Sequence, residues 1–213
     1  MKENLTEIVF ILDESGSMSS LRDDTIGGFN SYVEDQKKEP GEAYLTTVCF
    51  DDEYRLIHDH VNLQDVAPLS HKDYSPRGCT ALMDAVGRTI NSVGARLAAT
   101  SEEERPSHVI FVITTDGYEN ASKEFTRSQV KKMIEHQQSK YSWQFIFIGA
   151  GIDAYSEAES IGIGGMYAMS AAKSSTGVVN TYYSVSNATT MVRSLCTTDG
   201  LTDDSWKVGD LGQ

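Results

Sequence analysis

Short apolar runs alternate along the chain with longer segments of helical periodicity. Three of the runs cover Ile8 to Leu12, Val109 to Ile113 and Phe145 to Ile148. Their β-branched and aromatic residues are typical of strands buried on both faces of a parallel sheet. Two more runs, Ala43 to Phe50 and Tyr54 to His60, are separated by three acidic residues. A connection this short predicts an antiparallel hairpin.

Between the runs, apolar residues recur every three or four positions, which predicts helices that each lay one apolar side on a sheet. A short last strand is predicted from Met166 to Met169. Four helical stripes can be followed along the sequence: Leu21, Ile26, Phe29 and Val33; Leu82, Val86, Ile90, Val93 and Leu97; Val130, Met133, Ile134 and Gln137; and Val178, Tyr182, Val185, Thr189, Val192 and Cys196.

This alternation predicts a doubly wound, Rossmann-like α/β sheet with helices on both faces. The expected strand order is 3-2-1-4-5-6, with strand 3 antiparallel. The chain then leaves strands 1 and 4 in opposite directions, and ligands bind in the crevice at that switch, outside the carboxyl ends of the strands. We expect one domain over residues 1–196 and a surface tail, partly disordered, over 197–213, which Trp206 could pin down.

Composition narrows the class of partner. The chain has 213 residues, 39% of them hydrophobic and 23% charged, as in ordinary globular proteins. Its net charge of −13 argues against nucleic acids and anionic membranes as partners. The same negative charge has two explanations of similar weight. It suits cation binding, and it also keeps a protein in solution.

The cysteines and the apolar runs indicate a setting inside the cell. Cys49, Cys79 and Cys196 are odd in number and too widely spaced for a zinc site. No apolar stretch is long enough for a secretory signal or a membrane span. We therefore expect a cytoplasmic protein with reduced thiols, with Cys49 in the core and Cys196 at a helix end.

The candidate chemistry lies in three loops. Strand 1 leads into the sequence DESGS, which begins at Asp13, and strand 4 leads into TTDG, which contains Asp116. Thr80 opens the helix that precedes strand 4. Because that helix runs opposite to the strands, its N-terminus lies at their carboxyl ends. Asp13, Ser15, Ser17, Thr80 and Asp116 are thus expected to meet in the crevice.

Two carboxylates and three hydroxyls form a set of hard oxygen donors. Such a set suits Mg²⁺ or Mn²⁺ better than zinc or copper, with Ca²⁺ less favoured. Mg²⁺ retains some of its water, so the five groups need not all bind it directly. Two carboxylates offset the charge of the ion, which can still attract an outside carboxylate.

These residues resemble a known site. The pattern Asp13-x-Ser15-x-Ser17, followed by Thr80 and by Asp116-Gly117, resembles the metal-ion-dependent adhesion site of von Willebrand factor A domains, and the resemblance covers roughly residues 5 to 195. It implies that the hydroxyls contact the metal and that the aspartates hold it directly or through water. It also implies an open coordination position that takes a Glu or Asp from a partner protein.

The resemblance implies a protein-binding module that is not an enzyme. It extends to small stand-alone bacterial members of the family, some grouped with stress or tellurite resistance, and it suggests an adaptor that works with an ATPase or kinase. Cys79 stands where the family usually has glycine; it either fills space or offers a thiol beside the metal. The expected partner-binding rim comprises Glu14, Met18, Arg77, Tyr118, Glu119 and Asn120.

Two alternatives remain. The hydroxyls could simply cap helices and Asp116-Gly117 could be a plain turn. A different function would be Mg²⁺-dependent phosphoryl transfer or phosphoryl acceptance, with Asp13 as the nucleophile. Against it, haloacid dehalogenase-type phosphatases need an aspartate where Ser15 stands. Response-regulator receivers need a lysine after strand 5, where this chain has Gly149-Ala150-Gly151.

Overall fold

The computed structural model describes residues 1–195 and 200–212. These residues form a six-stranded sheet in the order β3-β2-β1-β4-β5-β6, in which β3 is antiparallel to β2 and the other neighbours are parallel. The predicted strand order and the reversed third strand are confirmed. The bounds are β1 Lys2–Asp13, β2 Glu42–Phe50, β3 Tyr54–Asn62, β4 Pro106–Thr115, β5 Gln144–Ala150 and β6 Ala168–Ala171.

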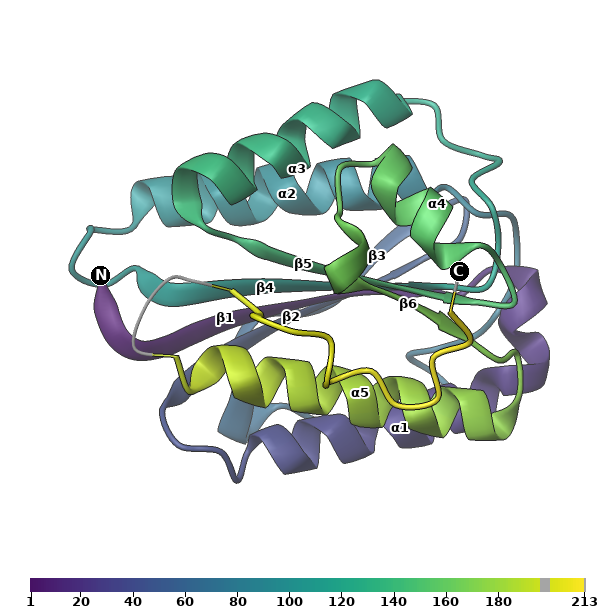
Figure 1. The fold of residues 1–213 in the computed structure, drawn as a ribbon, viewed down its shortest axis with the longest axis horizontal. Helices are drawn as coiled ribbons and strands as arrows, with labels where there is room; N and C mark the ends of the chain where they lie inside the picture. The colour runs from purple at the N-terminus through teal and green to yellow at the C-terminus, as the bar shows by residue number, and fades with distance from the viewer. Residues whose placement is uncertain (196–199, 213) are drawn as a thin grey trace.

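Helices cover both faces of the sheet (Figure 1). On one face lie α1 (Arg22–Gln36) and α5 (Ser175–Arg193), and on the other lie α2 (Leu82–Ala99), α3 (Arg127–Tyr141) and α4 (Ala154–Ser160). The four predicted stripes correspond to α1, α2, α3 and α5. The sequence did not predict α4, because its seven residues bury only two alanines. Short 3-10 helices span Gly16–Leu21, Leu63–Asp65 and Gly165–Tyr167.

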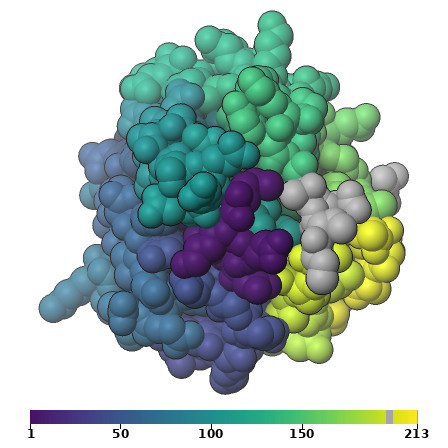
Figure 2. Space-filling model, turned by 90° about the vertical axis from the view of Figure 1, so that its left-hand side faces the viewer, coloured from purple at the N-terminus to yellow at the C-terminus, as the bar shows by residue number. Residues whose placement is uncertain are grey.

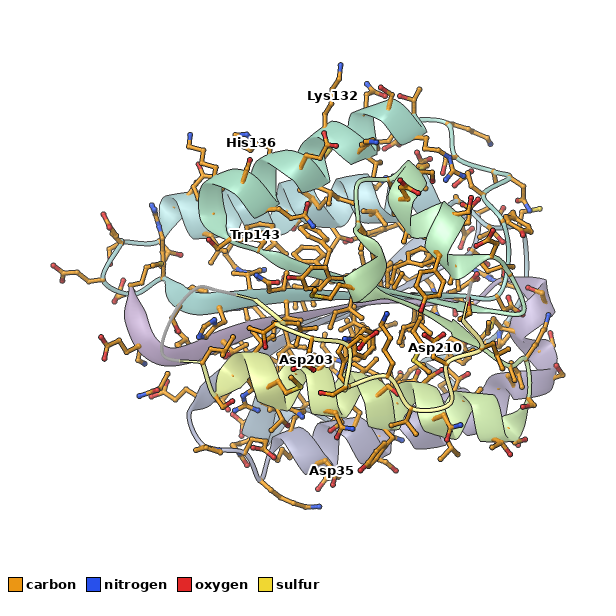
Figure 3. The ribbon with its side chains drawn as sticks, in the orientation of Figure 1. Asp35, Lys132, His136, Trp143, Asp203 and Asp210 are labelled. Carbon is orange, nitrogen blue, oxygen red and sulfur yellow. The ribbon has the colours of Figure 1, made fainter. Side chains whose placement is uncertain are left out.

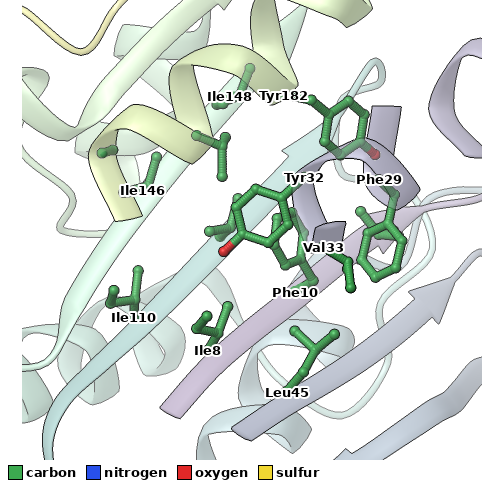
Figure 4. Packing of buried hydrophobic residues seen from close by; sticks show 14 of the residues in the cluster. Ile8, Phe10, Phe29, Tyr32, Val33, Leu45, Ile110, Ile146, Ile148 and Tyr182 are labelled. Carbon is green, nitrogen blue, oxygen red and sulfur yellow. The ribbon is translucent and has the colours of Figure 1, made fainter. Parts of the chain in front are cut away.

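Each face of the sheet has its own hydrophobic core. Toward α1 and α5, the ring of Phe10 makes edge contacts with Phe29 and Tyr32, at centroid distances of 5.4 and 4.8 Å (Figure 4). Toward α2 and α3, Phe111 stacks on Trp143 at 5.3 Å. Both faces are therefore buried, which explains why the strand sequences are continuously apolar rather than alternating.

The side chains on the outer helices follow the same division. In Figure 3, Trp143 lies between α3 and the sheet, whereas Lys132 and His136 of α3 and Asp35 of α1 point away from it. Each stripe of apolar residues thus faces the sheet, and the polar residues of the same helices face outward.

The last strand begins later than its sequence predicts. Met166 and Tyr167 belong to a 3-10 helix, and Met166 is exposed. Pairing with β5 starts where Ala168 lies opposite Phe147. The apolar residue Met166 therefore precedes the strand and is not part of it.

Residues 200–212 run along α5 and past the edge strand β6 (Figure 1). Trp206 and Leu201 are buried in the core on that side. The backbone N–H of Ser170 in β6 donates to the Asp210 carboxylate at 3.0 Å, and the N–H of Leu211 donates to the Ser170 carbonyl at 2.9 Å. The segment thus covers part of an edge that would otherwise present unpaired backbone groups. Cys196, expected at a helix end, lies outside the described residues.

The amino ends of the central strands reach the surface at one end of the molecule. Figure 2 looks onto that end, where the first residues, in purple, lie near the centre of the face. Among the described helices, none is both long and apolar enough to cross a lipid bilayer.

The burial of Trp206 gives a first prediction. Trp206→Ala should lower the free energy of unfolding by about 3 kcal/mol, because it removes a large buried side chain. Leu211→Ala, at an exposed position of the same segment, should change it by less than about 0.5 kcal/mol. Urea unfolding of both variants measures the difference. Equal, small effects would show that the segment is not part of the core.

Candidate metal centre

The predicted crevice lies where β1 and β4 end side by side. Asp13 is the last residue of β1, and Asp116 directly follows β4. Leu12 and Thr114 are paired in the parallel ladder, so Asp13 and Asp116 follow within one residue of the same level of the sheet. Both carboxyl groups are buried. Two buried carboxylates this close repel each other unless positive charge or hydrogen bonds compensate them.

A continuous chain of hydrogen bonds joins the two aspartates. Thr115 Oγ1 donates to Asp13 Oδ2 at 2.5 Å, and the backbone N–H of Ser15 donates to Asp13 Oδ1 at 2.7 Å. The hydroxyls of Ser15 and Ser17 are 3.1 Å apart, and Ser17 Oγ donates to Asp116 Oδ1 at 2.5 Å. The structure therefore brings four of the predicted residues into one network.

Thr80 joins this group from a third segment. A Cβ atom built on Gly117 would lie 3.1 Å from Thr80 Oγ1 and 3.9 Å from Ser17 Oγ, so both hydroxyls face the space beside Gly117. The backbone of Thr80 is held there by two hydrogen bonds with Asn120, one from its own N–H at 2.9 Å and one to its carbonyl at 3.0 Å. The three loops meet, as the topology predicts.

Helix capping does not account for the serine hydroxyls. Ser15 occupies the N-cap position of the 3-10 helix that starts at Gly16, but its side chain makes no capping hydrogen bond there. The N-cap position of α2 is Ala81, which has no side-chain oxygen to offer. The Ser15 and Ser17 hydroxyls instead face each other and Asp116. Their orientation fits a role toward a cation in the crevice.

Glu14, expected on the rim, is fully buried beneath the loops. Its carboxylate receives two hydrogen bonds from Arg55, both at 2.6 Å, and a longer one from the Ser75 backbone. Arg55 also donates to the Asp73 carbonyl at 2.7 Å. The rim assignment of Glu14 is therefore wrong: this side chain anchors the segment of residues 73–77 to the end of β1.

The β2–β3 hairpin holds the loop that carries Thr80. The buried Asp51 accepts from Arg77 Nε at 2.9 Å, and its carbonyl accepts from the N–H of Ala81 at 2.9 Å. Between them, Gly78 has a φ of 64°, and a Cβ there would lie 2.0 Å from Asp52 Oδ1. The positive φ and the close approach of Asp52 both favour glycine at this position. The next residue, Cys79, is exposed and its thiol is free.

The other rim residues divide by exposure. Met18 is buried in the core, so its rim assignment is also wrong, because it faces the α1 side of the sheet. Glu119 is half-buried, and its carboxylate accepts from the backbone N–H groups of Met83, Ala121 and Ser122. Three predicted rim residues are exposed: Arg77, Tyr118 and Asn120.

One residue in the site was missed by the sequence analysis. Lys173, between β6 and α5, places its Nζ 2.6 Å from Asp116 Oδ2. The residues after strand 5 are Gly149-Ala150-Gly151, and the lysine comes instead from the segment after β6. No sequence motif marks it. Its position could have been found only from the rule that every loop after a parallel strand lies at the same edge.

Burial dominates the electrostatics of the first aspartate. Loss of hydration raises the pKa of Asp13, and the nearby Asp116 carboxylate raises it further. Hydrogen bonds from Ser15 and Thr115 act in the opposite direction, because they favour the charged form. The site is thus built to hold negative charge that is only partly compensated by the protein itself.

Solved structures share this architecture. The chain matches proximal thread matrix protein 1 from the mussel byssus with a TM-score of 0.61 and 15% identity, over 87% of this chain and 48% of that one. It matches a von Willebrand factor type A protein from Catenulispora acidiphila with a TM-score of 0.57 and 12% identity, over 89% of this chain and 43% of that one. The chain has a von Willebrand factor A-like fold.

A second structure of the mussel protein, described as having a zinc-occupied metal-ion-dependent adhesion motif, matches this von Willebrand factor A-like chain with a TM-score of 0.59 and 18% identity. That match covers 91% of this chain and 47% of the other. The chain thus spans less than half the length of these solved chains. No protein-family model matches the sequence, and no curated protein matches it.

The donors present fit a hard divalent cation. The two carboxylates and three hydroxyls of the crevice are all oxygen ligands, the kind that Mg²⁺ and Mn²⁺ prefer. Within residues 1–195 and 200–212, no three His, Cys, Asp or Glu side chains cluster as a conventional metal site would. The residues of the von Willebrand factor A-like chain that could hold such an ion, with mixed carboxylate and hydroxyl donors, are Asp13, Ser15, Ser17, Thr80 and Asp116.

The buried pair beneath the loops can be tested by stability. Arg55→Met leaves the Glu14 carboxylate buried without its partner and should lower the free energy of unfolding by about 3 kcal/mol. Arg88→Met breaks a pair of similar geometry, with Glu124, on the surface and should cost less than about 1 kcal/mol. Urea unfolding at pH 7 compares them. Two equal losses would contradict a structural role specific to Glu14.

Proposed function

We propose that this chain is a metal-dependent protein-binding module that captures an acidic side chain of a partner. The main support for this proposal is the hydrogen-bonded network that joins two buried carboxylates to two serine hydroxyls, with the Thr80 hydroxyl facing the same space. The residues that would hold the ion are Asp13, Ser15, Ser17, Thr80 and Asp116.

The charge balance of the site supports capture of a carboxylate. Asp13 and Asp116 offset the charge of a divalent ion, and the neutral hydroxyls add none. An ion held in this way still attracts an outside anion, since no excess negative charge repels it. Mg²⁺ or Mn²⁺ fits five donors and retained water, whereas Ca²⁺ generally takes six to eight oxygen ligands. The bound ion would supply Lewis acidity toward the partner's Glu or Asp.

The surroundings support binding rather than catalysis. Residues 13–17, 77–82 and 114–117 contain no histidine. The nearby carboxylates of Glu14 and Glu119 are both committed to fixed hydrogen bonds, so neither is placed as a general base. The exposed Tyr118, Arg77 and Asn120 would contact the partner around the ion.

The cellular setting is part of the proposal. Cys49 and Cys79 are free thiols, which suits the reducing cytoplasm expected from the sequence. The family resemblance further suggests an adaptor in a bacterial stress-response or ATPase-linked complex. In such a complex, the metal site would supply the contact to the partner, and the rest of the fold would hold the site rigid.

Metal titration tests the site directly. Thr80→Ala and Asp13→Asn should each weaken Mg²⁺ or Mn²⁺ binding about tenfold or more, because the first removes a hydroxyl donor and the second removes a negative charge. Ser19→Ala is the control, since the Ser19 hydroxyl is exposed and bonds only to the Gly16 carbonyl. Isothermal titration calorimetry measures the affinities, and circular dichroism verifies that the variants fold.

Partner capture is the companion measurement. Affinity capture from native lysate with the wild-type chain should yield a protein that is lost in chelator and lost with Thr80→Ala, but retained with Ser19→Ala. A partner held at full yield in chelator would show that no metal bridge is involved.

Phosphoryl acceptance is the second candidate, and one observation favours it. Lys173 contacts Asp116 at the carboxyl edge of the sheet, the edge at which response-regulator receivers need a lysine. In that reaction, an Asp13 oxygen would attack the phosphorus of a small phosphodonor and the donor's leaving group would depart. We expect no acyl-phosphate after incubation with acetyl phosphate and Mg²⁺, as measured by intact mass. A stable gain of one phosphoryl group at Asp13 would reverse the choice.

A further inference from the structure

We propose that Lys173 competes with the divalent cation for Asp116, so that binding of the ion displaces the lysine ammonium from the site to the rim. The inference rests on the proposed metal-binding function and concerns one residue outside the predicted donor set. It makes Lys173 a positioning residue that tunes the affinity of the site for metal.

The contact is between a buried acceptor and a partly exposed donor. The Asp116 side chain is fully buried, while the Lys173 side chain is 37% exposed. Asp116 Oδ1 accepts from Ser17, and Lys173 Nζ lies 2.6 Å from Oδ2, which has no other partner among the described residues. The ion pair with Lys173 is therefore the contact that compensates the charge at Oδ2.

An ammonium and a divalent cation cannot share this carboxylate without strong repulsion. Two positive charges a few ångströms apart in a poorly hydrated crevice repel far more than they would in water. Asp116 is also one of only two carboxylates in the donor set. A cation that takes Asp116 as a ligand, directly or through water, therefore has to overcome the pair with Lys173.

The lysine can leave without a change in the backbone. A Cβ built on Gly151 would lie 3.2 Å from Lys173 Cβ and 3.7 Å from its Cδ, so the aliphatic stem rests against the Gly151 backbone. The Lys173 side chain is 37% exposed, and rotation about its outer bonds would carry the ammonium toward solvent. Displacement is thus a rotamer change of one side chain.

Calorimetric titration with MnCl₂ gives the first test. Lys173→Met keeps the stem and removes the charge, and it should bind Mn²⁺ about tenfold more tightly than the wild type, because no ion pair has to be broken. Lys123→Met removes the same charge from an exposed position on the segment that follows Asp116, and it should change the affinity less than about twofold. Equal affinities of wild type and Lys173→Met would overturn the inference.

Amine labelling separates displacement from a general effect of charge. In the wild-type chain, the Lys173 amine should react several times faster with an N-hydroxysuccinimide ester when Mg²⁺ saturates the site. The amine of Lys123 should react at an unchanged rate. Peptide mass spectrometry measures both rates. Tighter binding by Lys173→Met with unchanged labelling of Lys173 would show that the ammonium stays in place. If neither the wild type nor Lys173→Met binds a cation, the proposed metal-binding function fails.

Discussion

The closeness of two buried carboxylates, Asp13 and Asp116, is the constraint on which the site depends. They meet because β1 and β4 are parallel neighbours that end at the same level of the sheet. Burial disfavours their charged forms, so each needs hydrogen bonds or positive charge nearby. The protein supplies a hydroxyl and a backbone donor to Asp13, and a hydroxyl and an ammonium to Asp116. A divalent cation would supply the positive charge that these two carboxylates still lack. The hydroxyl groups of the crevice would serve as further oxygen donors to that ion.

The surrounding structure fixes the loops that carry these groups. Glu14 and Arg55 tie the end of β1 to the segment before Thr80, while Asp51 and Gly78 hold that segment against the β2–β3 hairpin. The donors are thus positioned by contacts between segments far apart in sequence and not by their own helices. The solved structures with a von Willebrand factor A-like fold share the scaffold at identities of 12 to 18%, so the chemistry has to be argued from this chain's own residues.

The sequence predicts the scaffold well because its signals are local. Continuous apolar runs such as Ile8 to Leu12 indicate burial on both faces of the sheet, and the three-residue connection after Phe50 predicts the antiparallel strand. The convergence of Thr80 with Asp13 and Asp116 follows from topology alone. Burial of Glu14 and the approach of Lys173 depend on partners 41 and 57 residues away, Arg55 and Asp116, which no local pattern reveals. Helix α4 escaped prediction because two alanines make too faint a stripe.

Anomalous diffraction from crystals grown with Mn²⁺ would locate the ion itself. We expect one anomalous peak in the crevice, with the hydroxyl oxygens of Ser15, Ser17 and Thr80 in its coordination sphere and the Asp13 and Asp116 carboxylates bound directly or through water. A peak bound elsewhere on the acidic surface, or no peak at millimolar Mn²⁺, would contradict it.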